Sequence, residues 1–93
     1  MTPASSGSYR LEIKKSAVKA ISALPMADRR RVDATIISLA GNPRPAGCKP
    51  LIAVPDTYRV RAGNFRIIYQ VLDRVLLVLV VRVGNRRDVY RGL

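Results

Sequence analysis

Histidine and tryptophan are absent from this chain, and cysteine occurs once, at Cys48. Without histidine, the most common general base and metal ligand is missing. A single cysteine forms no internal disulfide, and Cys48 has no histidine to activate it, so we interpret it as a passive residue that suits a reducing compartment. No apolar run approaches the roughly 20 residues of a membrane span, so we expect no membrane association. The longest run, residues 75–81, suits a buried strand.

Acidic residues are also few. Six Asp and Glu stand against 17 Lys and Arg, thirteen of them Arg, and the formal net charge is +11. The acids are scattered, which argues against a two-metal site, and no phosphate-binding loop or dinucleotide fingerprint occurs, so we expect no metal and no cofactor. Arginine forks onto phosphate oxygens, so the excess indicates contact with nucleic acid. A merely solubilising surface is the weaker explanation, because solubility does not favour arginine over lysine.

The length of 93 residues suits one compact domain. Residues 1–8 are polar and predict a flexible leader, and residues 9–93 form the expected single domain. Alternation predicts a strand over residues 9–13, and apolar spacing predicts helices over 16–24, with Ser16 as N-cap, and about 27–40. The apolar stripes of the two helices are Val18, Ile21 and Leu24, then Val32, Ile36 and Leu39.

The second half of the chain is rich in β-branched residues, in segments 57–62, 65–72 and 75–84. Gly63-Asn64 and Asp73-Arg74 separate them, and two-residue connectors of this kind favour tight antiparallel hairpins. The segment 44–55 predicts a loop or an irregular edge. The expected fold is therefore α+β in the order β-α-α-β-β-β, with two helices packed on one face of a small twisted antiparallel sheet.

The register of the first hairpin predicts an arginine cluster. With Gly63-Asn64 as the turn, Arg59, Arg61 and Arg66 share one face of the sheet. Arg61 would then oppose Arg66 directly, which is destabilising unless an anion lies between them. A solvated strand face is the alternative, but no acidic residue interleaves the three arginines. The other face would form the core, with Tyr58, Val60, Ala62, Phe65, Ile67 and Tyr69.

The second hairpin predicts an apolar strip beside this cluster. In the Asp73-Arg74 register, one set of residues falls on the arginine face, away from the helices, and the alternate set faces the core. Two helices can hardly cover both faces of the sheet, so we expect exposed apolar surface rimmed by positive charge, which is typical of a partner site. The first set is Leu77, Leu79, Val81 and Val83, and the second is Leu76, Val78 and Val80.

The C-terminal segment places an aromatic residue among basic ones, a combination that suits RNA. RNA carries its own nucleophile, because its 2′-hydroxyl attacks the adjacent phosphate when that phosphate is held in line and its charge is stabilised. Tyr90 is the plausible general base, although a phenol of pKa near 10 would need help from neighbouring arginines. A ring packed on the sheet edge is an equally good interpretation of Tyr90. The basic residues are Arg82, Arg86, Arg87 and Arg91.

Three segments, read together, resemble a known family. They are residues 58–61 (Tyr-Arg-Val-Arg), 63–69 (Gly-Asn-Phe-Arg-Ile-Ile-Tyr) and 83–90 (Val-Gly-Asn-Arg-Arg-Asp-Val-Tyr). With Leu24-Pro25 and Asn42-Pro43 after the two helices, their order is similar to that of the RelE-type mRNA interferases of the RelE/ParE toxin superfamily. The resemblance spans residues 9–90 and implies the β-α-α-β-β-β fold. Many relatives carry histidine at the position of Asn85.

The resemblance also implies a function in the cytoplasm. Family members cut mRNA in the ribosomal A site through 2′-hydroxyl attack and leave a cyclic phosphate. The implied partners are the ribosome, mRNA, an acidic RelB-like antitoxin and, through the antitoxin, operator DNA. The family's site residues correspond to Arg59, Arg61, Arg66, Arg86 as the acid and Tyr90 as the base. We add Arg82, Arg87, Arg91 and Lys49 as RNA-binding residues. Two alternatives stay open, namely a ParE-like toxin that inhibits DNA gyrase without cleaving RNA, and a non-catalytic RNA- or ribosome-binding module.

Overall fold

The computed structural model describes residues 8–85 and 87–90, with the side chains of residues 87 and 88 outside the description. The leader expected over residues 1–8 lies outside it apart from Ser8. Two helices and five strands follow one another in an order that extends the expected one by a short strand before the first hairpin. In chain order, the elements are β1 (Arg10–Ile13), α1 (Lys15–Ser22), α2 (Met26–Ser38), β2 (Lys49–Pro50), β3 (Thr57–Ala62), β4 (Phe65–Leu72), the 3-10 turn η2 (Asp73–Val75), β5 (Leu77–Gly84) and the 3-10 turn η3 (Arg87–Tyr90).

The five strands form one mixed sheet in the order β1-β5-β4-β3-β2. The pairs β2–β3, β3–β4 and β4–β5 are antiparallel, as expected. The expectation of a wholly antiparallel sheet is wrong at one edge, because β1 runs parallel to β5. No hairpin joins β1 to its neighbour, so local turn chemistry does not set its direction. Directly after β1, the backbone N–H of Lys14 donates a hydrogen bond to the carbonyl of Val80 at 2.9 Å, and the chain then turns into α1.

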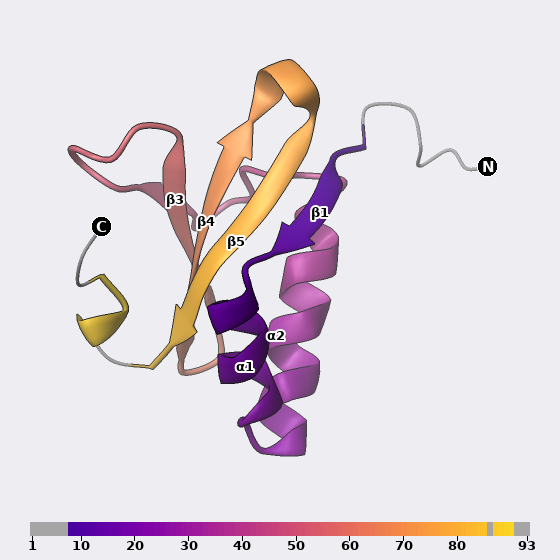
Figure 1. Ribbon diagram of the computed structural model, residues 1–93, viewed down its shortest axis with the longest axis vertical. Helices are drawn as coiled ribbons and strands as arrows, with labels where there is room; N and C mark the ends of the chain where they lie inside the picture. The colour runs from indigo at the N-terminus through magenta and orange to yellow at the C-terminus, as the bar shows by residue number, and fades with distance from the viewer. Residues whose placement is uncertain (1–7, 86, 91–93) are drawn as a thin grey trace.

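Both helices lie on the same side of the sheet and cover one of its faces (Figure 1), as the sequence predicts. The helix α2 contributes Val32, Ile36 and Leu39 to the core, all of them expected. The apolar stripe of α1 is shifted from the predicted one, since Ala17 is 1% exposed and Val18 is 45% exposed. The helix α1 begins at Lys15 with Lys14 at its N-cap position and no side-chain hydrogen bond capping it, so the prediction of Ser16 as the N-cap is wrong.

The first hairpin has the predicted register. Ala62 pairs with Phe65 and Arg61 pairs with Arg66. Gly63, at φ +64°, occupies the first turn position, where a type II′ turn favours glycine. Successive residues therefore alternate between the helix-covered face and the opposite face, which we call the open face. Core positions on β3 and β4 are as expected, including the fully buried Ile67 and Tyr69.

The second hairpin departs from its predicted register at the turn and again toward the far end of its two strands. Its turn is η2 followed by Leu76, which has a φ of +50° and is 47% exposed, so the placement of Leu76 in the core is wrong. A bulge interrupts the pairing, since Tyr69 pairs with Val80 whereas Ile68 pairs with Arg82. Beyond the bulge the faces exchange, so Val83 joins the core rather than the open face. The expected positions of Leu77, Leu79, Val78 and Val80 are correct.

Within residues 8–85 and 87–90, neither helix has the length and apolar character needed to span a membrane.

Candidate nucleic-acid interface

A hollow of about 330 Å³ lies on the open face at the β2–β3–β4 end of the sheet. Four of the basic residues singled out from the sequence line it, and sheet pairing brings them together. Lys49 pairs with Arg59 across β2 and β3, and Arg61 pairs with Arg66 across the first hairpin. We call this hollow the basic pocket. Its lining residues are Gly47, Lys49, Arg59, Val60, Arg61 and Arg66.

The charge of the basic pocket is uncompensated within the described part of the chain. None of its four cations forms an ion pair there, and the pairs that occur, Arg10–Glu12 and Arg44–Asp73, lie elsewhere. The Nε of Arg66 is buried and has no hydrogen-bond partner among the described residues. A buried donor without a partner costs about 1–3 kcal/mol. An anion in the pocket would relieve the repulsion between Arg61 and Arg66.

The turn η3 lies over the open face next to this pocket and carries Tyr90. The Nη1 of Arg59 donates to Tyr90 Oη at 3.4 Å, and the Nη1 of Arg82 donates to the carbonyl of Val89 at 3.3 Å. Val89 is buried, as is Ile68, which points to the open face but is 0% exposed. Tyr90 is therefore held at the rim of the basic pocket, and its ring is half-buried.

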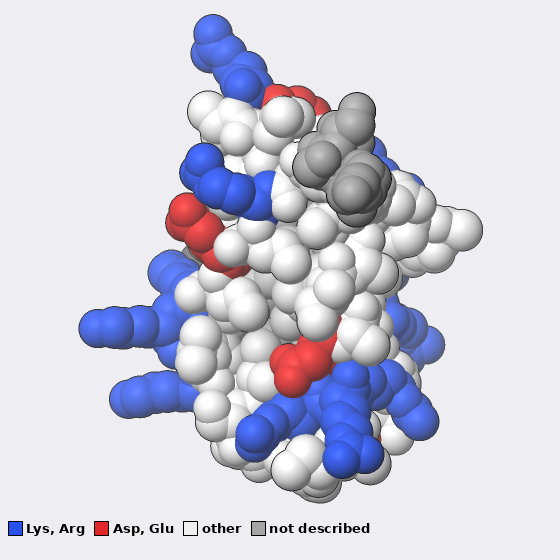
Figure 2. All heavy atoms as spheres, turned by 90° about the vertical axis from the view of Figure 1, so that its right-hand side faces the viewer, with Lys and Arg blue, Asp and Glu red and all other residues white. Residues whose placement is uncertain are grey.

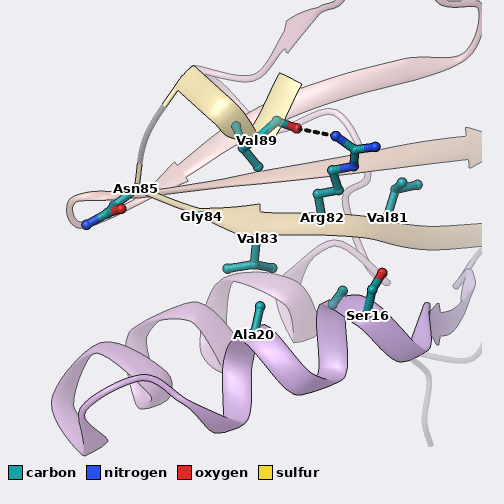
Figure 3. A pocket seen from close by; sticks show the side chains of 9 residues that line it. Ser16, Ala20, Val81, Arg82, Val83, Gly84, Asn85 and Val89 are labelled. Carbon is teal, nitrogen blue, oxygen red and sulfur yellow. Dashed lines mark hydrogen bonds between the residues drawn. The ribbon is translucent and has the colours of Figure 1, made fainter. Parts of the chain in front are cut away.

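Of the remaining candidate basic residues, some lie within the described part of the chain and others lie outside it. Arg82 extends from the open face of β5 toward η3, as Figure 3 shows, and so supports the turn rather than lining the pocket. Arg86 and Arg91 lie outside the described residues, as does the side chain of Arg87. Of the nine candidate residues, Lys49, Arg59, Arg61 and Arg66 share one hollow, and Tyr90 touches it through Arg59.

A second hollow, of about 350 Å³, was not expected from the sequence. It lies between α1 and the C-terminal end of β5, where small side chains of the helix, such as Ala20, leave space opposite Val83 (Figure 3). The strand β1 stops pairing with β5 at Val80, so that no other strand in the described part of the chain covers this part of the β5 edge. Valine and alanine side chains dominate the lining, so the hollow is less suited to an anion than the basic pocket.

A network at the opposite end of the sheet was also missed. Arg44, in the segment between α2 and β2, binds Asp73 of η2, with Nη2 and Oδ2 2.7 Å apart. The hydrogen bond from Arg44, with a second from Tyr9, lowers the pKa of the Asp73 carboxyl. Burial raises the pKa of the nearby Tyr69 phenol. Residues so far apart in the chain give no pattern from which this network could be found.

The chemistry of the site is limited to what cations and one phenol supply. No group of three or more His, Cys, Asp or Glu able to hold a metal ion occurs in the region the structure describes. Positive charge is not confined to the basic pocket, because the helix side of the molecule, seen in Figure 2, also presents more Lys and Arg than Asp and Glu. The arrangement is thus suited to binding a phosphate backbone, with one phenol placed beside the bound phosphate.

Comparison with protein families gives a match over almost the whole domain. The family model for the ParE toxin of the type II toxin–antitoxin system parDE matches residues 11–90. A putative RelE-like toxin protein of Escherichia coli is 33% identical over 86 residues, which cover 88% of this chain and 90% of that protein. The mRNA interferase toxin RelE of Escherichia coli K12 is 30% identical over 80 residues, which cover 84% and 83%.

Solved structures share the fold. In the archaeal RelE–RelB complex from Pyrococcus horikoshii, a chain that is 30% identical superimposes with a TM-score of 0.76, covering 86% of this chain and 98% of that one. In the intact Escherichia coli RelBE toxin–antitoxin complex, the corresponding values are 28% identity, a TM-score of 0.74, and coverage of 85% and 98%.

Proposed function

Since the chain belongs to the RelE/ParE superfamily of type II toxin–antitoxin toxins, we propose that it is a ribosome-dependent endoribonuclease that cleaves mRNA through the RNA's own 2′-hydroxyl. The observation that carries this proposal is the basic pocket, where, among the residues the structure describes, four cations meet without a carboxylate and the buried Nε of Arg66 has no partner. The cytoplasm, where ribosomes are, is the compartment in which it would act.

The proposed reaction needs a held phosphate and two proton transfers. Lys49, Arg59, Arg61 and Arg66 bind the scissile phosphate and stabilise the charge that develops on it, which is the largest contribution that a site of this kind makes. The 2′-oxygen attacks phosphorus, the bond to the 5′-oxygen breaks, and a 2′,3′-cyclic phosphate remains. Tyr90, fixed beside the pocket by Arg59, accepts the proton of the 2′-hydroxyl in its phenolate form and becomes the neutral phenol. The departing 5′-oxygen takes a proton from the acid, a role we assign to Arg86.

The basic residues outside the pocket have a separate role in this proposal. Arg87 and Arg91 bind RNA. Arg82 contributes by supporting η3, through its bond to the Val89 carbonyl, and so keeps Tyr90 at the pocket.

The proposed partner is an acidic antitoxin of the RelB type. The open face carries a half-buried apolar strip of Leu72, Leu77 and Leu79, which lies toward the η2 end of β4 and β5 on the same face as the basic pocket. An antitoxin segment with apolar side chains on this strip and carboxylates in the pocket would block RNA by occupying its charges. Solved relatives are toxin–antitoxin complexes of RelE with RelB, which supports this kind of partner. Operator DNA would be bound through the antitoxin.

A ParE-like inhibitor of DNA gyrase is the second candidate, favoured by the family model that matches residues 11–90. Primer extension on a translated mRNA after induction of the toxin separates the two. Cuts inside ribosome-covered codons, absent from the same mRNA when its start codon is removed so that it is not translated, support the nuclease. Uncut mRNA together with altered plasmid supercoiling would instead support the gyrase inhibitor. Uncut mRNA with unchanged supercoiling, and protein bound to ribosomes, would support the non-catalytic binding module.

A further inference from the structure

The segment that brings Lys49 to the basic pocket is weakly held by its own strand. Lys49 lies on β2, which has only two residues and forms the edge of the sheet. Two residues make too few ladder hydrogen bonds to fix a strand by themselves. The place of Lys49 therefore depends on how the preceding segment, residues 41–48, is attached to the rest of the molecule.

Arg44 attaches this segment at three points. Its Nη2 and Nη1 bind the two carboxylate oxygens of Asp73 at 2.7 and 3.3 Å. Its Nε donates to Tyr58 Oη at 3.0 Å, and its guanidinium lies 5.2 Å from the centre of the Tyr58 ring. Asp73 is itself held by the Tyr9 hydroxyl, which donates to it at 2.5 Å. We call Arg44, Asp73 and Tyr58 the clamp.

The clamp acts on the strands that form the pocket. Tyr58 is the residue before Arg59 on β3 and pairs with Pro50, the residue after Lys49. Next to Arg44, the carbonyl of Pro43 accepts a hydrogen bond from the buried Tyr69 hydroxyl at 2.8 Å. The segment is thus attached to β3, β4 and η2 at once, just before it enters β2.

Arg44 is poorly placed to bind RNA itself. Its Nη1 and Nη2 bind Asp73, which also neutralises its charge, and its Nε donates to Tyr58. It does not line the basic pocket. A guanidinium with this geometry is a fixed crosslink between segments.

We propose that Arg44 is a positioning residue of the RNA site, which holds residues 41–48 against β3 and η2 so that Lys49 reaches the phosphate bound in the basic pocket. This inference rests on the proposed function for the identity of the ligand, whereas the attachment of the segment does not depend on it.

Replacing Asp73 tests the proposal, because a purely electrostatic role and a positioning role predict opposite changes in RNA affinity. Asp73→Ala removes a negative charge, so simple electrostatics, or a direct RNA contact by the freed Arg44, would tighten RNA binding. Loss of positioning instead weakens it, by about tenfold at low salt if the contact of Lys49 with phosphate is lost. Asp33→Ala is the matched control, because it removes the same charge from an exposed site on α2. Tighter binding by Asp73→Ala than by Asp33→Ala would overturn the proposal.

Coupling to Lys49 gives the second measurement. If Arg44 acts through Lys49, then Arg44→Lys, which keeps the charge but loses the fork, lowers affinity as much as Lys49→Gln does. The double variant is then no weaker than Lys49→Gln alone. In both single variants the slope of log affinity against log salt falls by about 0.7, the value for one phosphate contact on a single strand. Fully additive losses would show that Arg44 does not act through Lys49.

The single cysteine reports on the segment without RNA. Cys48 is half-buried against the core and precedes Lys49. Its alkylation rate should rise in Asp73→Ala and Arg44→Lys and stay unchanged in Asp33→Ala, with the folded state checked by thermal melting. If the alkylation rate rises in these variants but the wild type does not cleave RNA, the attachment of the segment is supported and the proposed function is refuted. An unchanged rate with active wild type would refute the attachment.

Discussion

The direct opposition of Arg61 and Arg66 gives a prediction in which stability and function change in opposite directions. The two residues pair across the first hairpin, and no carboxylate compensates them in the part of the chain described. Arg61→Gln removes one of the two charges while keeping a long polar side chain. Because Arg61 is exposed, the substitution opens no cavity in the core.

The expected gain in stability is small but measurable. Two unit charges about 7 Å apart in water repel each other by about 0.6 kcal/mol, which lies within the range of about 0.2–1 kcal/mol for cross-strand pairs. For a domain of this size, about 0.5 kcal/mol corresponds to a rise of about 2–4 °C in the melting temperature. The rise should shrink as salt is added, since salt screens the repulsion.

The same substitution should weaken RNA binding. Loss of one phosphate contact lowers the slope of log affinity against log salt by about 0.7. Thermal melting and a salt titration of RNA binding measure the two effects on one sample. Arg74→Gln is the control, because Arg74 is exposed on η2 and does not line the basic pocket. A clear loss of stability with RNA binding untouched would show that Arg61 is a structural residue and that the pocket is not an anion site.

Four further predictions follow from individual residues. Arg66→Met should raise the free energy of unfolding, by up to about 1–3 kcal/mol, because it removes a buried donor that has no partner among the described residues, while RNA binding falls; a lower melting temperature would show that Arg66 stabilises the free protein. Tyr90→Phe should slow single-turnover cleavage by about 100-fold, the scale of one general base, and an unchanged rate across pH would show that Tyr90 only packs. Because the folded pKa of Asp73 is lowered, its contribution to stability is present above the unfolded pKa and is lost as the pH falls through the folded pKa; urea melts should show this loss in the wild type and not in Asp73→Ala. The antitoxin should protect amides of β4 and β5 from hydrogen exchange and abolish cleavage, and Leu79→Asp should weaken its binding; protection confined to the helices would refute this placement of the partner.

The parts of the fold that could be predicted are those set by local chemistry. Gly63-Asn64 lies between segments of alternating polarity, so both the turn and the register follow from it, and the arginine cluster follows from the register. The second hairpin is different, because residues 75–81 are apolar at every position and no alternation fixes their faces. The η2 turn shifts the pairing by two residues and leaves the expected faces unchanged, whereas the bulge moves Val83 from the expected open face to the core.

The parts that could not be predicted depend on long-range contacts. The direction of β1 is set by its pairing with β5. The paired residues Arg10 and Leu77 are 67 positions apart in the chain. The ion pair of Arg44 with Asp73 joins residues 29 positions apart, and neither has a motif that marks it. Lys49 could be proposed from charge alone, but its place in the pocket depends on β2, a strand too short to be recognised in a segment rich in proline.

Cleavage of an mRNA with a single 2′-deoxy nucleotide tests the central claim most directly. Ribosomes are stalled with the scissile codon in the A site, and the purified protein is added to this mRNA or to its all-ribose counterpart. The account predicts that the all-ribose mRNA is cut to a 2′,3′-cyclic phosphate and that the 2′-deoxy mRNA stays intact. Equal cutting of both would contradict attack by the 2′-hydroxyl, and intact RNA in both, with gyrase inhibited by the same protein, would contradict the nuclease altogether.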